Sequence, residues 1–317
     1  MFWMILFFAG GGICLYLGAE SLVRGASRIA HALSVDPLLI GITIVGFGTS
    51  VPEMVISVMA SAENRPTVAL GNVLGSNVAN IGLILGLTAA LAAVPAPRRL
   101  ARREVAFMLA ATAIFYLLCW RGRIDRIDAI LLLAGLVWFT VSLVRWTMRE
   151  STVAAEVRRD AFREYRQGLG LERDLGLALG GIGGLVLGGH LFVRAAVVLA
   201  RTTGVSEVVL SATIIAVGGS LPELATSLVA TRHHRSELLL GNLVGSNVFN
   251  ILGAMGLAAL VRPIVLKVSP LSLEFLGLLA FSAVLALLVW QGKRVRRVQG
   301  TCLLAGYCIF VVLLFTV

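Results

Sequence analysis

The sequence predicts an all-α polytopic membrane protein with ten transmembrane helices, arranged as two inverted five-helix repeats. Three observations lead to this fold class: the composition, the length of the apolar segments, and an internal repeat. Of the 317 residues, 58% are hydrophobic and 14% are charged, whereas about 25% of the residues of an average soluble domain are charged. The composition therefore argues against a soluble fold.

Ten apolar segments have about the 20 residues that a helix needs to cross a hydrocarbon core of roughly 30 Å. They cover residues 2–23, 38–60, 67–93, 104–120, 128–147, 175–200, 206–230, 237–260, 270–290 and 298–316. A cleavable signal peptide begins with basic residues, but the first segment has none before Tyr16. We therefore expect it to remain as the first transmembrane helix.

The net charge of +10 could indicate a nucleic-acid partner, but the basic residues lie in short loops between the apolar segments. When alternate loops are assigned to alternate sides, one side receives 19 of the 27 Lys and Arg residues. The positive-inside rule makes that side cytoplasmic and places both termini outside. We expect an integral protein of a bacterial plasma membrane, with lipid rather than nucleic acid around it; the sequence does not indicate an oligomeric state.

The internal repeat has a constant offset of 170 residues. Residues 41–81 match residues 211–251 at 18 of 41 positions without a gap. Five apolar segments separate each element from its copy, and this odd number reverses the orientation of the copy in the membrane. We expect a first repeat at 1–147, a cytoplasmic linker at 148–174 and a second, inverted repeat at 175–317. Transporters built in this way bind their substrate near the midplane, at the interface between the repeats.

Each repeat carries a proline in the middle of an apolar segment, beside glycines and directly before an acid: Pro52 and Pro222. Proline lacks an N–H and clashes with the carbonyl four residues back. We therefore expect both helices to break, freeing backbone carbonyls at Gly46 to Gly48 and at Ala216 to Pro222. At this depth such carbonyls need partners or a water-lined cavity.

The two acids, Glu53 and Glu223, are the strongest functional signal, because an acidic residue at a helix centre costs about 2.5–3.5 kcal/mol. They could be protonated packing groups, but their recurrence in the inverted copy favours a shared cation site. Calcium prefers six to eight oxygen ligands, and no His/Cys spacing typical of zinc competes. Matched hydroxyl and amide oxygens are available from Thr49, Ser50, Ser76, Asn80, Ser220, Ser246 and Asn250.

Other matched residues are more ambiguous. The small-xxx-small spacings of Gly71 with Gly75 and of Gly241 with Gly245 favour helix packing. Four asparagines, Asn72, Asn77, Asn242 and Asn247, are as well suited to hydrogen bonds between helices as to cation binding. Glu20 and its counterpart His190 lie near predicted span ends and are interpreted as interfacial anchors, and His233 as a solvated loop residue.

Taken together, Gly48-Thr-Ser-Val-Pro-Glu53 and Gly218-Gly-Ser-Leu-Pro-Glu223 resemble the α-repeats of the cation/calcium antiporter superfamily. Gly71-Asn-Val-Leu-Gly-Ser-Asn77 and Gly241-Asn-Leu-Val-Gly-Ser-Asn247 resemble the signature of the helix that follows. The resemblance implies sodium/calcium exchange by alternating access, without a cofactor and without enzymatic activity. It also implies that the first and sixth helices slide across the other eight.

Site residues follow from the same resemblance. It implies that Glu53 and Glu223 are shared between a calcium site and flanking sodium sites, which the polar residues named above and the carbonyls of Gly46 and Ala216 complete. Two departures stand out. Gly219 occupies a position where the second repeat usually carries Thr, so one expected hydroxyl is missing. Asn250 occupies a position where many relatives have an acid, and with only two site carboxylates potassium co-transport is less favoured.

Two other functions remain as alternatives at this point. A proton-coupled calcium exchanger would use the same glutamates and differ only in the driving ion. An intramembrane hydrolase would use paired carboxylates as acid and base, but it leaves the duplicated Ser and Asn residues unexplained and lacks a recognisable nucleophile. Because two close carboxylates bind protons readily, protons should inhibit transport or replace sodium.

Overall fold

The computed structural model describes residues 2–32, 37–96, 98–150, 170–202, 216–266, 272–291 and 294–316. In the first half these form the elements α1 (Phe2–Ala32), α2 (Pro37–Ile40), η1 (Gly41–Val45), α3 (Gly46–Ala62), α4 (Pro66–Ala79), η2 (Asn80–Leu85), α5 (Gly86–Leu91), β1 (Val94–Pro95), α6 (Arg98–Trp120), β2 (Arg123–Ile124) and α7 (Arg126–Glu150). The elements labelled η are π-helical segments.

The second half repeats this order about 170 residues later. Its described elements are α9 (Gly170–Thr202), α11 (Ala216–Gly219), α12 (Leu221–Arg232), α13 (Ser236–Val248), η4 (Phe249–Ala254), α14 (Met255–Val261), β3 (Ile264–Val265), α15 (Leu273–Gln291), β4 (Arg294–Val295) and α16 (Arg297–Thr316). The predicted linker falls mostly on residues 151–169, which lie outside the described residues. The helices on either side extend beyond the predicted segments, to Glu150 and from Gly170.

Nine helical stretches among the described residues are long and apolar enough to cross a membrane. They correspond to nine of the ten predicted segments. The remaining segment, 206–230, includes residues 203–215, which lie outside the described part of the chain, and continues in α11 and α12. The predicted all-helical, polytopic fold with two inverted repeats is thereby confirmed.

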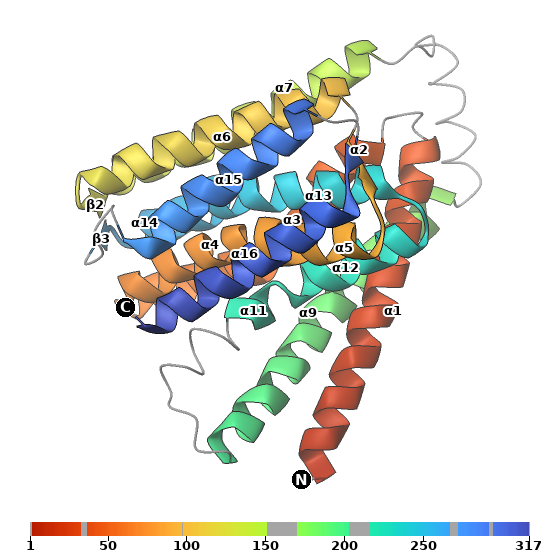
Figure 1. Ribbon diagram of the computed structural model, residues 1–317, viewed down its shortest axis with the longest axis horizontal. Coiled ribbons are helices and arrows are strands. Elements are labelled where there is room, and N and C mark those ends of the chain that lie inside the picture. The colour runs from red at the N-terminus through yellow and green to blue at the C-terminus, as the bar shows by residue number, and fades with distance from the viewer. Residues whose placement is uncertain are drawn as a thin grey trace.

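The two repeats are joined crosswise by two short antiparallel strand pairs. β1 of the first repeat pairs with β4 of the second, and β2 pairs with β3. An offset of about 170 residues relates β1 to β3 and β2 to β4. It thus converts one strand pair into the other, as expected for two copies related by a two-fold axis. The 23 residues of α6 span about 35 Å at 1.5 Å per residue, and they separate β1 from β2. The two pairs therefore lie at opposite ends of the helix bundle, which agrees with inverted repeats (Figure 1).

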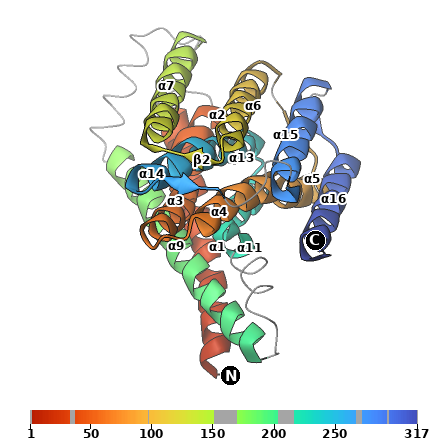
Figure 2. The same ribbon diagram turned by 90° about the vertical axis from the view of Figure 1, so that its left-hand side faces the viewer.

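The equivalent helices α1 and α9 form a separate antiparallel pair that crosses the other helices steeply (Figures 1 and 2). Their backbones touch through glycines. A Cβ atom on Gly18 would lie 2.7 Å from the backbone nitrogen of Leu185, and one on Gly181 would lie 2.6 Å from that of Leu22. No larger residue fits at these two positions without moving a helix.

Both helices are longer than their apolar segments, because polar residues pair across the interface instead of ending the helix. Arg28 of α1 binds Asp174 of α9 at 3.3 Å, and Glu20 lies twelve residues before the end of α1 and is 9% exposed. α1 therefore continues past the predicted segment 2–23, and Glu20, which the sequence suggested as an interfacial anchor near a span end, lies within the helix.

The predicted break at the proline occurs in one repeat only. In the first repeat α3 continues through Pro52, and the irregular stretch is the π-helical η1 that ends one residue before Gly46. In the second repeat Ser220 separates α11 from α12, and Pro222 lies in the first turn of α12. Backbone N–H groups in the first turn of a helix have no intrahelical acceptor, so the missing N–H of Pro222 costs no hydrogen bond there.

Candidate cation-binding site

The candidate site lies in the centre of the bundle, where α3, α4 and η2 of the first repeat meet α12, α13 and η4 of the second. Gly241 and Gly245 permit this meeting, because Cβ atoms there would lie 2.5 Å from the carbonyl oxygens of Leu38 and Ile42. The packing role predicted for these two glycines is confirmed. The polar side chains that gather here are all at most 2% exposed: Thr49, Ser50, Glu53, Ser76, Asn80, Ser220, Glu223, Ser246 and Asn250.

The two glutamates form the core of the site. Both are 0% exposed, and their carboxyl groups are close enough to interact electrostatically. None of their four oxygen atoms has a hydrogen-bond partner among the described residues. A buried carboxylate left without a partner is strongly destabilising, so these oxygens require a cation or a proton.

Beside Glu223, three oxygen atoms converge from the other repeat and from α13. The hydroxyls of Thr49 and Ser246 flank the carboxyl group and lie 3.3 Å apart. Thr49 donates to Asn242 Oδ1 at 2.9 Å, and Ser246 lies 3.4 Å from the carbonyl oxygen of Gly46. Because the Thr49 hydrogen points to Asn242, the lone pairs of this hydroxyl remain available to a cation.

Beside Glu53, the equivalent positions are arranged differently. Ser76 donates to the Asn72 carbonyl at 2.7 Å and accepts from Asn250 Nδ2 at 3.1 Å. The position equivalent to Thr49 is Gly219, where a Cβ atom would lie 3.5 Å from Glu53 Oε1 and 3.9 Å from Asn72 Oδ1. The Cβ position of Gly219 thus faces Glu53 and Asn72, the counterparts of Glu223 and Asn242, but the hydroxyl is missing.

Four further side-chain oxygens of the nominated residues are buried without a partner in the described part of the chain. Ser50 Oγ, Ser220 Oγ, Asn80 Oδ1 and Asn250 Oδ1 are buried and have no hydrogen bond among the described residues. Each comes from a residue that the sequence nominated as a ligand. Ala216, the last nominated residue, begins α11.

A set of supporting hydrogen bonds holds these residues in place. Asn72 Nδ2 donates to Ser57 Oγ at 2.9 Å and to the Glu53 carbonyl at 3.0 Å. The equivalent contact in the other repeat is longer, with 3.5 Å between Asn242 Nδ2 and Ser227 Oγ. The asparagines therefore connect helices, one of the two roles left open from the sequence.

Ser57 and Ser227 were not among the predicted site residues, although they are identical at the 170-residue offset and this match could have revealed them. A second contact, from Asn80 Nδ2 to Asn247 Oδ1 at 3.0 Å, joins the two repeats. Asn247 also reaches the Met108 sulfur at 3.5 Å, and no motif marks that methionine. Asn77, by contrast, has no partner for its amide group among the described residues.

The donor set consists of oxygen atoms. Within the described ranges no group of three or more His, Cys, Asp or Glu side chains is placed to hold a metal ion. Any cation here would thus be bound by two carboxylates together with hydroxyl, amide and carbonyl oxygens, which are the ligands that hard cations prefer.

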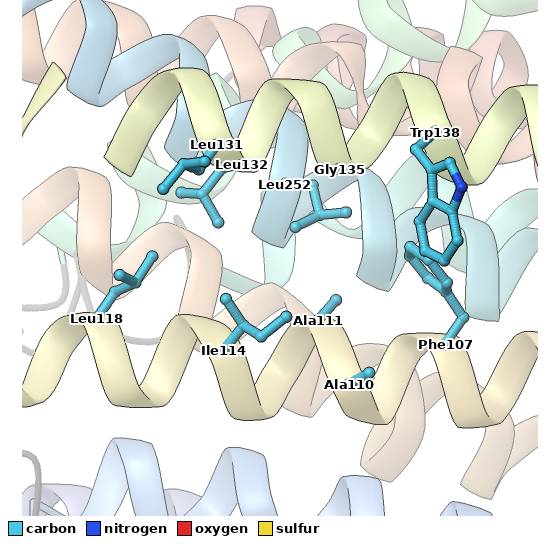
Figure 3. Close-up of a pocket in the computed structure, with 10 residues that line it drawn as sticks. All are labelled: Phe107, Ala110, Ala111, Ile114, Leu118, Leu131, Leu132, Gly135, Trp138 and Leu252. Atoms are coloured by element: carbon cyan, nitrogen blue, oxygen red, sulfur yellow. The ribbon is translucent and has the colours of Figure 1, made fainter. Parts of the chain in front are cut away.

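The large cavity between α6 and α7 is a different feature. It has a volume of about 400 Å³, and Figure 3 shows side chains of α6 and α7 facing each other across it, with Leu252 of η4 at its base. Its lining is apolar, with Phe107, Leu131 and Trp138 among its residues. It offers no carboxyl, hydroxyl or amide oxygen and cannot bind a cation.

Among the described residues, an ionic contact connects the long α1/α9 pair to the rest of the bundle. Glu20 of α1 lies 2.8 Å from His233 Nε2, directly after α12, and 2.6 Å from Arg24. His233 is therefore not simply a solvated loop residue. At the equivalent positions of the other repeat, Glu63 pairs with Arg65 at 3.6 Å, and His190 is exposed.

An inverted-repeat bundle with paired, unpartnered carboxylates at its centre defines the class of secondary-active membrane transporters for cations. The family model for "sodium/calcium exchanger protein" matches residues 3–145 and 174–316. The chain therefore belongs to the sodium/calcium exchanger protein family.

Three similar proteins place it within that family. The putative antiporter CaxA of Alkalimonas amylolytica is 35% identical over 98% of this chain and 98% of its own. The inner membrane protein YrbG of Escherichia coli strain K12 is 33% identical over 96% and 94%. A structure of the sodium-calcium exchanger NCX_Mj soaked with Na⁺ and Sr²⁺ has a TM-score of 0.84 at 29% identity and covers 98% of both chains.

Proposed function

We propose that this protein exchanges calcium for sodium across the membrane by alternating access, with Glu53 and Glu223 as ligands for both ions. The observation that carries the proposal is the pair of fully buried carboxyl groups without hydrogen-bond partners. Two negative charges balance one calcium ion. Family membership and the likeness to a solved sodium-calcium exchanger support the choice of ions.

The remaining ligands in this proposal are the oxygens that converge on the two carboxylates. Calcium would take the two carboxylates with nearby carbonyls, including those of Gly46 and Ala216. Sodium ions would use Thr49, Ser50 and Ser246 on one side and Ser76 and Ser220 on the other, with Asn80 and Asn250 between them. Backbone carbonyls of interrupted helices are typical sodium ligands in inverted-repeat transporters.

The distribution of charge supports an orientation in the membrane. Because the basic loops mark the cytoplasmic side, we place both termini outside, the 148–174 segment in the cytoplasm between repeats 1–147 and 175–317, and the protein in a bacterial inner membrane. The α1/α9 pair, which packs on the rest through few ionic contacts, would be the part that moves.

The proposal is tested by uptake of radioactive calcium into proteoliposomes. Vesicles loaded with sodium should take up calcium, and vesicles with only a proton gradient should not. Glu53→Gln and Glu223→Gln should each reduce uptake at least about 100-fold. A contact with a charged group is worth about 1.5–3 kcal/mol, and each substitution also leaves one charge of the bound calcium ion without a balancing carboxylate. The apolar-cavity variant Ile114→Val is the matched control and should transport normally.

Other outcomes point to other functions. Uptake driven by protons without sodium would identify a proton-coupled calcium exchanger with the same ligands. Uptake that does not change between mildly acidic and alkaline pH would contradict a site with two close carboxylates, since protons must compete with cations there.

A further inference from the structure

We propose that Gly219 makes the two sodium-binding halves of the site unequal, so that sodium binds tightly beside Glu223 and weakly beside Glu53. This inference rests on the proposed function, because it assigns unequal affinities to sodium positions in the same site. Its basis is a comparison of equivalent atoms in the two repeats.

The first step is the correspondence between Thr49 and Gly219, which differ by the 170-residue offset. Thr49 Oγ1 binds Asn242 Oδ1 at 2.9 Å. A Cβ atom placed on Gly219 would lie 3.9 Å from Oδ1 of Asn72, which is the residue equivalent to Asn242. Each position therefore faces an asparagine of the other repeat, and the two positions differ in the side chain and in the local backbone, which is continuous in α3 and interrupted at Ser220.

The second step concerns what the missing hydroxyl would do. On the Glu223 side, Thr49 and Ser246 contribute hydroxyl oxygens 3.3 Å apart, with the Gly46 carbonyl 3.4–3.5 Å from both. Such a cluster can surround a monovalent ion together with one carboxylate oxygen. On the Glu53 side, no described residue has a hydroxyl group within hydrogen-bond distance of Ser76 Oγ, and one lone pair of this oxygen already accepts the Asn250 amide.

The third step is that the space for a side chain exists. The nearest atom to a Cβ at position 219 is Glu53 Oε1 at 3.5 Å, an ordinary van der Waals distance. A threonine hydroxyl would project from this Cβ toward Asn72 and Glu53. With glycine, water must supply the missing ligand, and a water molecule is less firmly held than a side chain that the helix fixes in place.

The experiment compares the wild type with Gly219→Thr and Gly219→Val, which have the same shape and differ in the hydroxyl. The sodium concentration for half-maximal calcium uptake is measured for each, together with the rise in unfolding temperature that sodium causes in detergent. We expect Gly219→Thr to lower the half-maximal sodium concentration about two- to tenfold, the value of one added neutral polar contact, and to enlarge the sodium-induced rise in unfolding temperature. Gly219→Val should do neither.

The reciprocal pair completes the test. Thr49→Val should raise the half-maximal sodium concentration, because it removes the hydroxyl from the tight half. The proposal is overturned if Gly219→Thr and Gly219→Val behave alike, or if Thr49→Val leaves sodium binding unchanged. Failure of the proposed function is distinguishable from this result, since it would show as a wild type whose calcium uptake does not require sodium.

Discussion

The two copies of the Gly-x-Ser-x-Pro-Glu element have nearly the same sequence and adopt different backbones. In the first copy the helix continues through Pro52, and in the second it is interrupted at Ser220. Each copy has two glycines shortly before the serine, Gly46 and Gly48 in the first and Gly218 and Gly219 in the second. A proline beside glycines thus permits a break in a span without requiring one.

The same comparison holds for the polar contacts. The Glu223 side uses a threonine and a serine in loose contact, whereas the Glu53 side uses a serine that binds firmly to Asn72 and Asn250. Equivalent residues therefore have unequal contacts: Ser246 is the one that the proposed function makes a cation ligand with loose hydrogen bonds, whereas Ser76 also holds the helices together.

Replacing these two serines gives the largest expected difference between the halves. Ser76→Ala should lower the free energy of unfolding by about 1–3 kcal/mol, because it leaves the buried Asn250 amide without its acceptor. Ser246→Ala should lower it less, since its contacts are 3.3–3.5 Å long. Thermal unfolding in detergent measures both. Equal losses of stability would show that the difference in hydrogen bonding has no energetic weight.

Two equivalent positions of the α1/α9 pair offer a second comparison. Glu20 of α1 contacts His233, while His190 and Glu63, the equivalent residues with acid and base exchanged, do not contact each other. Glu20→Gln should increase hydrogen exchange in residues 229–236 about fivefold, because a partly exposed ionic contact is worth up to about 1 kcal/mol.

Glu63→Gln is the control for this prediction. Its carboxylate has only the exposed contact with Arg65 at 3.6 Å, so exchange in residues 229–236 should remain as in the wild type. An equal response to Glu20→Gln and Glu63→Gln would show that the two positions contribute equally.

The smallest expected effect concerns the starts of α7 and α16. Asp125 accepts hydrogen bonds from the backbone N–H groups of Asp128 and Ile127, and the first of these holds the pKa of Asp125 below its usual range. The residue directly before α16 is Arg296, whose side chain has no oxygen that could accept a backbone N–H; its own N–H donates to Gln299 Oε1 at 2.8 Å. Asp125→Ala should therefore lower the unfolding temperature slightly at neutral pH.

The pH dependence of this effect has a definite sign. A carboxyl group whose pKa is lowered in the folded state stabilises the protein at pH values above its unfolded-state pKa, which is about 3.9 for Asp. This contribution is lost as the pH falls through the folded-state pKa. The difference between wild type and Asp125→Ala should shrink below that pH. Arg296→Asp, which places a carboxylate directly before α16 in the other repeat, is the matched variant; a difference that grows on acidification would contradict the capping role.

Much of the fold could be predicted from the sequence, because span length and the 170-residue offset are direct consequences of bilayer thickness and duplication. The site residues, too, are brought together as the matched positions suggested. The features that escaped prediction depend on the third dimension. Strands of two residues leave no pattern, π-helical segments have no residue signature, and polar residues such as Asp174 extend a helix only when a partner such as Arg28 lies opposite.

The crossed strand pairs have a consequence for how the chain is made. β1 ends at Pro95 and must wait for Arg294 before it can pair, a delay of roughly 10–40 s at 5–20 residues per second. During that time the first repeat has entered the membrane with half of its polar centre uncovered. Neither repeat can therefore mature alone during biosynthesis, and a chain interrupted between them would leave a helix set that lacks its closing partner.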